Sequence, residues 1–518
     1  MSKFCCLFNH YNSNRTINSY VFALLDNFSS LDCETIIISN SPLETTEGKR
    51  LLKERFKGKF VERENKGYDF GAWQYAMEMD LIPEDTEYLF LMNDSVFGPL
   101  YDFQNALEEM LSDQSVDFFG LTDSLEGQWH LQSYFLCFKR HVFTSPIFKK
   151  FFKKKFVSFS KKEVIEQGEL ELTSVLENAG FKGKAIFEYQ KITGGNNNPF
   201  RYKNANHFFI TQLITEMKFP FIKKEFIFSN PYNIEINGGV LAMLNTHTAY
   251  PVKYITEALQ DHLSIKKEEQ QRTEPLIDVI NHIYYLNTAY RFLISLSELK
   301  KYNCRFIFNL SSELYEDFYF MNILTSSFKN AIIIKTSNVG KDIGGKLAMI
   351  DWALQLKEKS TFTILLHDKQ SPHSSLGETW RKKLFRIIEP LYIPLIIKLF
   401  DENKKNGIVA AKEFIKNEFD KNTGNFDCTS NSILKTIIRQ YGFSNCNFDF
   451  VGGTMFWIRT EILSTFFSEY SALEIRSTLE RANVLDNNHG TSTHAWERML
   501  SWIAAKQGFE IRGINEHI

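Results

Sequence analysis

The sequence predicts an α/β protein made of two tandem domains, each built around a largely parallel β-sheet. The first observation is a repeated heptad: Asn65-Lys-Gly-Tyr-Asp-Phe-Gly71 recurs as Asn338-Val-Gly-Lys-Asp-Ile-Gly344. The second is that both halves alternate short apolar strands, which end in polar residues, with segments of helical periodicity, as parallel sheets require. We therefore interpret the chain as an internal duplication of one domain.

The residues that flank the heptad keep nearly the same spacing in the two halves. Asp94 follows Asn65 by 29 residues and Asp368 follows Asn338 by 30, and each aspartate closes an apolar run. The second half then carries about fifty more residues than the first before the next shared landmark, a glutamate. We expect these extra residues to form an insertion in the second domain.

The first half predicts its elements in a regular order. Strands are expected at residues 4–8, 35–38 and 88–92, with a further strand leading into Asn65, and helices at residues 16–28, 47–56 and 72–79. Polar residues follow each of these strands. Because ligands of parallel sheets bind at the carboxyl ends of the strands, we expect the functional residues there.

The second half repeats this order. Strands are expected at residues 279–283, 305–308 and 331–334, and a helix at residues 287–299. A charged run with little apolar content, residues 266–272, marks the seam between the copies. We therefore expect a first domain at residues 1–240, a linker or helical connection at 241–275, and a second domain at 276–518.

The composition indicates a soluble globular protein, with 43% hydrophobic and 24% charged residues. The 60 basic and 62 acidic side chains create no positive field for a polyanion, which argues against a nucleic-acid partner. Seven cysteines, an odd number without a C-x-x-C pair, indicate reduced thiols. No secretory signal or membrane-spanning run is recognisable. We expect a cytoplasmic protein, at most associated with the cytoplasmic face of a membrane.

The strand end Asn93-Asp94-Ser95 offers a carboxylate, an amide and a hydroxyl group together. Such oxygen ligands can hold Mg²⁺ or Mn²⁺ between two phosphates, with Asp94 as the candidate metal ligand. The alternative is a simple turn, completed by Gly98-Pro99, in which Asp94 and Ser95 bond the backbone. Recurrence of an acidic residue at both strand ends favours the functional interpretation.

The second copy differs at the same place, because its strand ends in His367-Asp368-Lys369 and is followed by His373 and Arg381. Lysine, histidine and arginine are good partners for phosphate groups. We therefore expect this polar loop to clamp a diphosphate, and a copy that uses Lys369 in this way needs no metal.

The heptad lies where a strand gives way to a helix. Its glycines, Gly67 and Gly340 among them, permit positive φ and a close approach of ligand to backbone. Asn65, Asp69, Asn338 and Asp342 offer amide and carboxylate groups to ribose or sugar hydroxyls. The alternative for Asp69 is a helix N-cap. The heptad is neither a phosphate-binding P-loop nor a dinucleotide fingerprint, which argues against kinases and hydride-transfer enzymes.

A glutamate at a helix start ends each copy. Glu169 and Glu497 both have a Leu three residues on and a Gly-Phe pair at eleven and twelve. Such a carboxylate can act as the general base that deprotonates an acceptor hydroxyl. The alternatives are a favourable first-turn charge and, in the first copy, Glu171 as the base. The position after strands 134–138 and 455–458 favours catalysis.

A basic segment from Lys149 to Lys162 alternates with phenylalanine and has no counterpart in the second half. Basic residues interleaved with Phe suit an anionic membrane surface, here the inner face of the membrane. A solvated helix that covers the core with its Phe face is an equal alternative.

Ten segments carry a resemblance to a known family. They are ENKGYDFGAW, LFLMNDSVFGPL, DFFGLTDS, HLQSYFLCFKR and KFPFIKKEFIFSNP in the first half, and NVGKDIGG, LLHDKQSPH, GETWRKKL, VGGTMFWIR and GTSTHAWERML in the second. These segments resemble the rhamnan synthesis protein F family, whose bacterial members are associated with rhamnose-containing cell-wall polysaccharides, O-antigens and capsules. The resemblance covers nearly the whole chain.

The resemblance implies two tandem glycosyltransferase domains of the GT-A type, a Rossmann-like fold for nucleotide-diphospho-sugars. It implies that Asp94 and Asp368 stand at the acidic motif and Glu169 and Glu497 at the base. Each strand end offers one carboxylate instead of the common pair, so metal dependence stays open. By position, the residues implied for the nucleotide-sugar pocket are Asn9 and His10 within 9–12, Ser39 within 39–41, Asn65, Gly67, Asp69, Asn93, Ser95, Asn309, Asn338 and Asp342.

Together these observations favour a bacterial glycosyltransferase that transfers rhamnose from a nucleotide donor, dTDP-rhamnose or similar, to a growing lipid-linked glycan. Inversion is expected if one base acts without a covalent intermediate. A non-catalytic carbohydrate-binding or scaffold protein that kept the fold is the main alternative. A nucleotidyltransferase ranks last, because the loop Asn9-His-Tyr-Asn12 lacks the Gly-rich, basic character such enzymes need.

Overall fold

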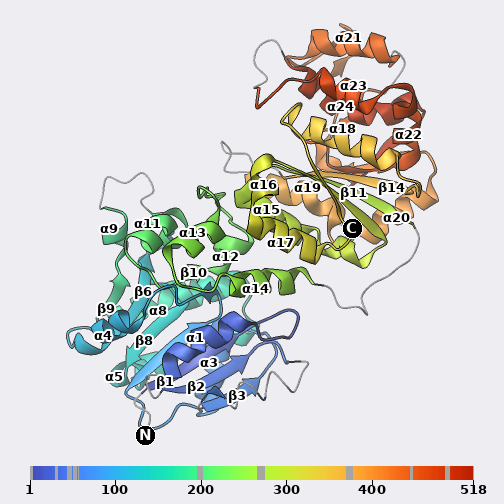
Figure 1. Cartoon of the computed structure of the whole chain (residues 1–518). Helices are drawn as coiled ribbons and strands as arrows, with labels where there is room; N and C mark the ends of the chain where they lie inside the picture. Colours follow the sequence, from blue (N-terminus) through green and yellow to red (C-terminus); the bar gives the residue numbers. More distant parts are fainter. Residues whose placement is uncertain are drawn as a thin grey trace. The chain divides into compact units, whose positions relative to one another are not determined.

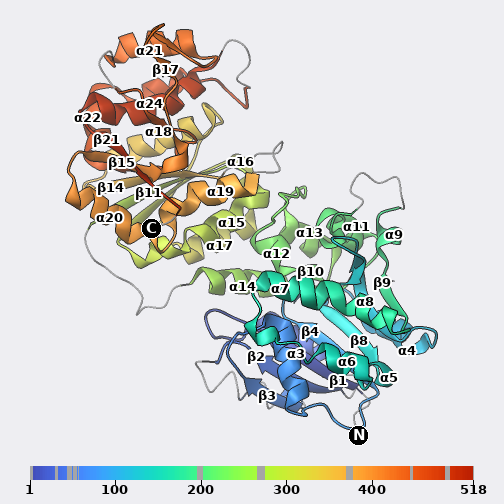
Figure 2. The same ribbon diagram turned by 180° about the vertical axis from the view of Figure 1, so that it is seen from behind.

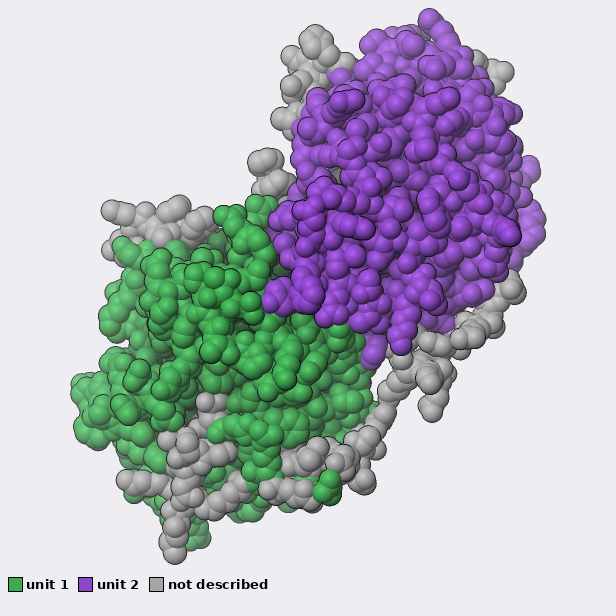
Figure 3. Space-filling model, viewed as in Figure 1, with its two compact units in different colours: residues 1–262 green, residues 263–518 purple. Residues whose placement is uncertain are grey.

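The structure is a computed structural model that describes residues 4–29, 33–43, 50, 55–56, 58–194, 202–264, 275–368, 377–443, 447–484 and 490–516. The chain divides into two compact units, Met1–His262 and Leu263–Ile518 (Figure 3). Each unit contains its own sheet and its own buried apolar residues.

One mixed sheet forms the centre of the first unit. Its strands are β1 (Phe4–His10), β2 (Cys33–Ser39), β3 (Gly58–Glu62), β4 (Tyr88–Asn93), β6 (Phe118–Ser124), β7 (His130–Leu131), β8 (Phe135–Lys139) and β9 (Gly183–Phe187). They run in the order β3-β2-β1-β4-β8-β6, and β6 pairs with both β7 and β9 (Figure 1). The first four strands are parallel, and β8 is antiparallel to its neighbours β4 and β6.

Helices surround this sheet. They are α1 (Ser19–Ser29), α3 (Tyr68–Glu78), α4 (Gln104–Ser112), α5 (Arg140–Phe143), α6 (Pro146–Phe151), α7 (Lys161–Val164), the π-helix η2 (Ile165–Leu170), α8 (Glu171–Asn178), α9 (Tyr189–Ile192), α10 (Ala205–Phe208), α11 (Ile210–Thr215), α12 (Lys224–Phe228), α13 (Val240–His247) and α14 (Lys253–Leu263). A short antiparallel pair, β5 (Val96–Phe97) and β10 (Ile222–Lys223), joins the residues after β4 to α12.

The apolar core of the first unit lies against one face of the sheet, where α3, α6 and α8 pack (Figure 2). Phe70 and Trp73 of α3 are buried in this core, and the Trp73 indole N–H donates to the Leu7 carbonyl oxygen at 3.2 Å. Burial of side chains this large contributes about 1.5–3 kcal/mol each. The helix that follows the heptad is therefore held firmly on the sheet.

The phenylalanines of the basic segment belong to this core. Phe151, Phe152 and Phe156 are buried and pack around Phe70, whereas Lys149 faces solvent. The structure therefore agrees with a solvated segment that covers the core with its Phe face, and these rings are not available to a membrane. Within the described ranges, no helix is both long and apolar enough to cross a bilayer.

Apart from β7, which has no counterpart among the described residues, the sheet of the second unit has the same order and the same strand directions as that of the first. Its strands are β11 (Ile277–Ile283), β12 (Cys304–Leu310), β13 (Ile332–Lys335), β14 (Phe362–His367), β15 (Asn406–Ala411), β20 (Phe456–Arg459) and β21 (Glu510–Ile514). The order is β13-β12-β11-β14-β20-β15-β21, with β20 antiparallel to both neighbours and β15 parallel to β21. The α/β class with parallel strands at its core, as predicted from the sequence, is confirmed.

The helices of the second unit are α15 (Leu286–Ser295), α16 (Ser312–Glu316), α17 (Phe318–Ser327), α18 (Lys341–Leu354), α19 (Gly377–Phe385), α20 (Tyr392–Glu402), α21 (Asn431–Tyr441), α22 (Thr460–Glu469), α23 (Ala472–Ser477) and α24 (Ser492–Lys506). Most of the additional residues of this half lie between β15 and β20. They include three short strands, β16 (Ile415–Lys416), β17 (Phe419–Asp420) and β18 (Asn425–Phe426), and the helix α21.

The predicted elements mostly agree with the structure, and one helix starts earlier than predicted. Helix α3 begins at Tyr68, four residues before its predicted start, because the heptad itself turns into the helix. The predicted helix at 47–56 lies largely outside the described residues. The segment expected as a linker or helical connection, 241–275, contains α13 and α14, and their Leu244 and Leu259 are fully buried.

Candidate active site

Both sheets bring polar residues together at the carboxyl edge of the central parallel strands. In the first unit Asn9 of β1 lies opposite Asn93 of β4, and the Asp94 N–H donates to Asn9 O at 3.1 Å. In the second, His282 lies opposite His367 at the corresponding position, where the backbone N–H of the following aspartate donates to His282 O at 3.0 Å. The two strand ends are therefore built in the same way.

The heptad forms the same turn in both units. Gly67 and Gly340 stand at the N-cap with φ of 74° and 70°, the left-handed region that favours glycine. A Cβ at Gly71 would lie 2.4 Å from Lys66 O, and one at Gly344 even closer to the preceding loop, so both positions require glycine. This turn places the heptad aspartate in the first turn of its helix.

The heptad aspartates face the strand ends. In the first unit the Asn93 side-chain amide donates to Asp69 Oδ2 at 2.9 Å. In the second unit His367 Nδ1 lies 3.5 Å from Asp342 Oδ2. The N-cap alternative for Asp69 is wrong, because Gly67 is the N-cap and no side chain caps this helix.

The two glutamates also occupy matching positions. Glu169 Oε1 accepts the Ser133 N–H at 3.1 Å, and Glu497 Oε1 accepts the Gly453 N–H at 2.6 Å, in each case from the loop before the antiparallel strand β8 or β20. Neither glutamate starts an α-helix as predicted: Glu169 lies in the π-helix η2 and Glu497 lies inside α24. Glu171 forms an ion pair with Lys154 at 2.7 Å, which weakens it as an alternative base.

A cavity of about 270 Å³ opens at this edge of the second unit, and a second cavity of about 230 Å³ adjoins it, since both are lined by His282, Tyr284 and Asn338. Residues expected from the sequence that line the larger cavity are Asn338, Asp342, His367, Asp368 and Glu497. Strand ends, heptad and glutamate, which are far apart in the sequence, thus meet around one space.

Asp368 is held at the cavity by the loop after β11. Its Oδ2 accepts the N–H groups of Tyr284 and Tyr285 at 2.9 and 2.7 Å. Burial raises the pKa of Asp368 to about 7, and the neighbouring Asp342 charge adds to the rise, although the two N–H donors oppose it. A carboxyl group that titrates near neutrality therefore lines the cavity.

This raised pKa predicts a pH-dependent stability. The folded protein keeps the Asp368 proton up to about pH 7, whereas the unfolded chain releases it near the ordinary value of 3.8. The free energy of unfolding should therefore fall as the pH rises from 4 to 7, by on the order of 4 kcal/mol from this group. Urea unfolding of the wild type and of Asp368→Asn across this range measures it, and equal slopes for the two proteins would contradict it.

His282, which the sequence did not single out, lies neutral beneath the cavity. Burial lowers its pKa to about 4. Its Nδ1 lies 3.0 Å from the Asn309 side-chain amide, and Asn309 in turn accepts the Thr336 hydroxyl at 3.0 Å. Asn309 is fully buried, so it positions His282 and does not itself line the cavity.

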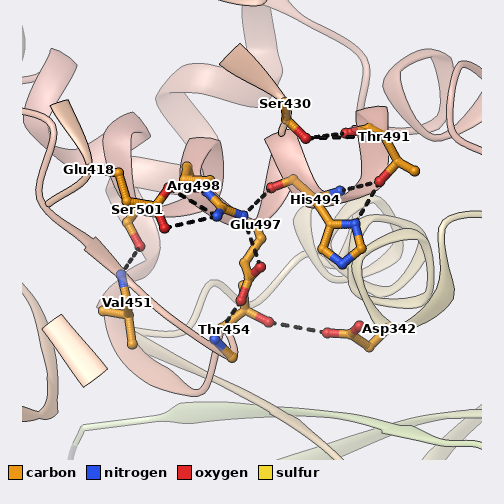
Figure 4. A network of polar contacts seen from close by, with 11 residues as sticks. Asp342, Glu418, Ser430, Val451, Thr454, Thr491, His494, Glu497, Arg498 and Ser501 are labelled. Atoms are coloured by element: carbon orange, nitrogen blue, oxygen red, sulfur yellow. Dashed lines mark hydrogen bonds and ion pairs between the residues drawn. The ribbon is translucent and has the colours of Figure 1, made fainter. Parts of the chain in front are cut away.

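The glutamate of the second unit lies in a polar network (Figure 4). In Figure 4 the Glu497 side chain points toward the loop that carries Thr454, whose hydroxyl group donates to Asp342 Oδ2 at 3.2 Å. Glu497 Oε2 accepts from Arg498 at 3.1 Å, and Arg498 also pairs with Glu418. His494, one turn before Glu497, lines the same cavity and contacts the Thr491 hydroxyl at 2.7 Å.

The first unit differs around Asp94. The Tyr20 hydroxyl donates to Asp94 Oδ2 at 3.0 Å, and the Lys224 ammonium group lies 3.5 Å from the same oxygen and 2.7 Å from the Tyr20 hydroxyl. Asp94 is thus engaged by a phenol and a cation from two other elements. The Asp94 carboxylate therefore already makes a hydrogen bond and an ion pair within the unit.

The loop after β1, expected to line a nucleotide pocket, is held by α14. Asn12 and Asn18 donate to Asp261 Oδ2 at 2.8 and 3.2 Å, and Asn14 donates to Asp261 Oδ1 at 3.3 Å. His10, by contrast, is buried and contacts the Ser39 hydroxyl at 3.1 Å. In the first unit the donors of this loop are therefore directed to an aspartate of the same unit.

Asp69 of the first unit nevertheless keeps a perturbed carboxyl group. Burial raises its pKa to about 6, and the charge of Glu169 raises it further, while the Asn93 amide opposes the shift. The heptad aspartate and the candidate base of the first unit therefore lie within electrostatic reach of each other.

The remaining predicted residues lie as follows. Asn65 is exposed and accepts from the Asn40 amide at 3.3 Å, and the Ser95 N–H donates to Asn93 Oδ1 at 3.1 Å. Arg381 lies on α19 with its guanidinium 5.3 Å from the Phe385 ring and does not line the cavity. Lys369 and His373 lie outside the described residues, so the diphosphate clamp stays a prediction.

Sequence reasoning missed several residues that line the cavity: His282, Tyr284, Tyr285, Lys341, Asn483, Thr493 and His494. Two had a usable signal. His282 aligns with Asn9 when the two strand ends are superimposed in sequence, and His494 lies three residues before Glu497, on the same face of a helix. Tyr284 and Tyr285 act in part through backbone N–H groups, which leave no mark in a sequence.

The described side chains at the two strand ends do not form a site for a resident divalent cation. Within the described ranges no group of three His, Cys, Asp or Glu residues is arranged to hold a metal ion. Asp94, the predicted metal ligand, is paired with Lys224, and Asp368 accepts the backbone N–H groups of Tyr284 and Tyr285. The carboxylates at both strand ends are therefore engaged by the protein itself.

Comparison with known proteins finds relatives for part of the chain. The chain is 28% identical over 197 residues to virulence protein VirA of Vibrio anguillarum, a match that covers 33% of this chain and 63% of VirA. Less than two thirds of that relative is therefore spanned.

Two solved structures are similar at 12% sequence identity. The glycosyltransferase GlyE of Streptococcus pneumoniae matches with a TM-score of 0.29, over 74% of this chain and 90% of GlyE. The mannosyltransferase PcManGT of Pyrobaculum calidifontis, in complex with GDP-Man and Mn²⁺, matches with a TM-score of 0.26, over 35% of this chain and 54% of PcManGT. At such TM-scores these likenesses carry no argument about function.

A match to one protein family covers most of the chain. The family described as rhamnan synthesis protein F matches residues 35–509, which is nearly the entire chain. This chain therefore belongs to the rhamnan synthesis protein F family.

Proposed function

We propose that the protein is a glycosyltransferase and that the cavity of the second unit is its site of transfer. One observation carries this proposal: Asp342, Asp368 and Glu497, from three separate elements, line one cavity at the carboxyl edge of a parallel sheet. That edge is where sheets of this kind bind their ligands. The assignment of all named site residues is part of the proposal.

In this proposal Glu497 is the general base. Its Oε1 is anchored by the Gly453 N–H, and the carboxylate takes the proton of an acceptor hydroxyl as that oxygen attacks the anomeric carbon of the donor. A single base without a covalent intermediate inverts the anomeric configuration. Lys341, which lines the cavity, supplies positive charge for the departing diphosphate.

The two carboxylates at the cavity hold the donor in place. Asp342 and Asp368 accept hydroxyl groups of the sugar or ribose. The smaller adjoining cavity, lined by the hydroxyls of Ser311, Ser312 and Thr336 and by Tyr284, suits the nucleoside. An aromatic ring and several hydroxyls are what a ribose and a base require.

The family supports a finer proposal about the substrate. Because its description is rhamnan synthesis, we propose a rhamnosyl donor such as dTDP-rhamnose and a growing cell-surface polysaccharide, lipid-linked, as the acceptor. Location in the cytoplasm is part of the same proposal, and contact with the inner membrane face then falls to the lysines of 149–162, since Phe151, Phe152 and Phe156 are buried.

We further propose that the chain arose by tandem duplication of a GT-A-like domain. The matching strand orders, the matching heptad turns and the two glutamates anchored by equivalent N–H groups support it. The domains would then correspond to the two units on either side of residue 262.

A second role, glycan binding without catalysis, is favoured for the first unit. Asp94 is paired with Lys224, and Asp261 takes up the donors of the loop after β1. The same alternative, applied to the whole chain, would make it a scaffold protein that keeps the fold.

A panel of sugar nucleotides tests the function. A nucleotide-rhamnose at 100 times its Kd should stabilise the full-length chain by about 2.7 kcal/mol, seen as a rise in Tm, and the protein should consume it in the presence of an oligosaccharide acceptor. Free nucleotide diphosphate and an unrelated sugar nucleotide are the controls. A chain that responds to no sugar nucleotide, in binding or turnover, would favour the scaffold alternative.

A further inference from the structure

Lys346 of the second unit is a buried cation directly beneath the cavity. Its side chain is 0% exposed, and its Nζ lies 3.1 Å from Asp342 Oδ2, 2.9 Å from His367 Nδ1 and 3.0 Å from Thr454 O. Two of these three partners, Asp342 and His367, line the cavity. The ammonium group therefore connects two cavity residues from below.

An ammonium group can only donate hydrogen bonds. The Asp342 oxygen that faces Lys346 is thus an acceptor, as an ionised carboxylate requires. His367 Nδ1, 2.9 Å from the ammonium nitrogen, is likewise placed to accept, and in that arrangement the imidazole proton is on Nε2. One buried lysine therefore sets the hydrogen-bonding character of both side chains.

The first unit shows what the same carboxylate does without a lysine. Trp73 occupies the helix position of Lys346, four residues after the heptad aspartate, and its indole N–H bonds Leu7 O. There burial raises the pKa of Asp69 to about 6. In the second unit burial also opposes ionisation of Asp342, but neighbouring basic side chains, Lys346 among them, hold the pKa of Asp342 well below its usual range.

We propose that Lys346 is a positioning residue of the second site: it holds Asp342 as an acceptor-only carboxylate and His367 as the tautomer that carries its proton on Nε2. The cavity then offers a bound sugar a fixed pattern of one acceptor and one donor for its hydroxyl groups. This role in sugar recognition rests on the proposed function. Lys346 itself is covered by these residues and acts through them.

The helix spacing supports this assignment. Asp342 and Lys346 are separated by four residues on α18, so they lie on one face of the helix and reach each other without strain. The strand end that carries His367 and the loop that carries Thr454 supply the other partners. Burying an ammonium group costs free energy even when acceptors from three elements surround it. A lysine at this position therefore points to a role at the site and not to a gain in stability.

The test compares Lys346→Met with Lys506→Met in the full-length protein. Lys506, on α24, also has a partly buried ammonium, which donates to Tyr441 O at 2.9 Å outside the cavity lining. Lys346→Met should raise the KM for the sugar nucleotide at least tenfold, and Lys506→Met should leave it unchanged. ¹⁵N spectra of labelled histidine should show His367 protonated on Nε2 in the wild type and in both tautomers in Lys346→Met.

Two further results make the test decisive. Lys346→Met leaves the buried Asp342 carboxylate without its cation, so this variant can fail to fold. In that case the double variant Lys346→Met/Asp342→Asn, which removes both charges, is used to measure the His367 tautomer. Unchanged KM and an unchanged His367 tautomer in a folded variant overturn the role of Lys346. A wild type that binds no sugar nucleotide overturns the proposed function and the sugar contact, while the tautomer still decides whether Lys346 sets His367.

Discussion

Replacing Glu497 with Gln is expected to lower the rate of glycosyl transfer by about 10²- to 10⁴-fold, the contribution typical of general acid–base catalysis. The Gln carbonyl oxygen can still accept the Gly453 N–H, which lies 2.6 Å from Glu497 Oε1, so the loop keeps its place. The amide cannot take a proton from the acceptor hydroxyl. Steady-state kinetics should therefore show a fall in kcat with little change in the KM for the donor.

The first unit provides the matched control. Glu169 accepts the Ser133 N–H in the equivalent position, so Glu169→Gln makes the same chemical change in the same local geometry. If transfer takes place in the second unit, this variant keeps its kcat. The opposite pattern would move the chemistry to the first unit, and full activity in both variants would exclude either glutamate as the base.

The parts of the site that could be predicted from the sequence are those carried by short, local patterns. The heptad predicted its own turn, because Gly67 and Gly340 are needed at positive φ wherever the chain turns from strand to helix in this way. Asp368 and Glu497 were found because each keeps its spacing from a strand or from an apolar pattern. Helix α3, however, starts earlier than periodicity suggested, since the periodic pattern begins only after the turn.

The parts that could not be predicted are tertiary contacts between residues far apart in the chain. Nothing near Asp94 indicates that Lys224, 130 residues away, lies 3.5 Å from it. The hydrogen bond from Asn12 to Asp261 joins residues that are 249 positions apart in the sequence. Both contacts distinguish the first site from the second, and the sequence repeat predicted neither of them.

The difference between the two sites also arises at single residue positions. Trp73 in the first unit and Lys346 in the second occupy the same helix position, yet one extends the apolar core and the other introduces a buried charge beneath a cavity. Under the proposed duplication, both units kept their strand order while a few such substitutions decided which unit has a polar site. The two units therefore share a sheet and differ in single residues around the strand ends.

Replacing Asp368 with Asn is expected to lower kcat/KM for the donor by about 10- to 100-fold, the range of a lost hydrogen bond to a charged group. The Asn carbonyl oxygen can still accept the N–H groups of Tyr284 and Tyr285, so the loop after β11 should keep its conformation. Asp94→Asn is the control, because the carboxylate of Asp94 is committed to Tyr20 and Lys224. Equal losses in the two variants would contradict this difference between the sites.

The pH profile sharpens this prediction. Because burial raises the pKa of Asp368 to about 7, kcat/KM of the wild type should rise as the pH passes through neutrality and the carboxyl group ionises. The free energy of unfolding should fall over a lower range, from pH 4 to about 7, between the unfolded and the folded pKa of Asp368. A single substitution, Asp368→Asn, should abolish both dependences, since they come from one proton. A variant that keeps the rise in activity would show that another group titrates and that Asp368 serves only the loop.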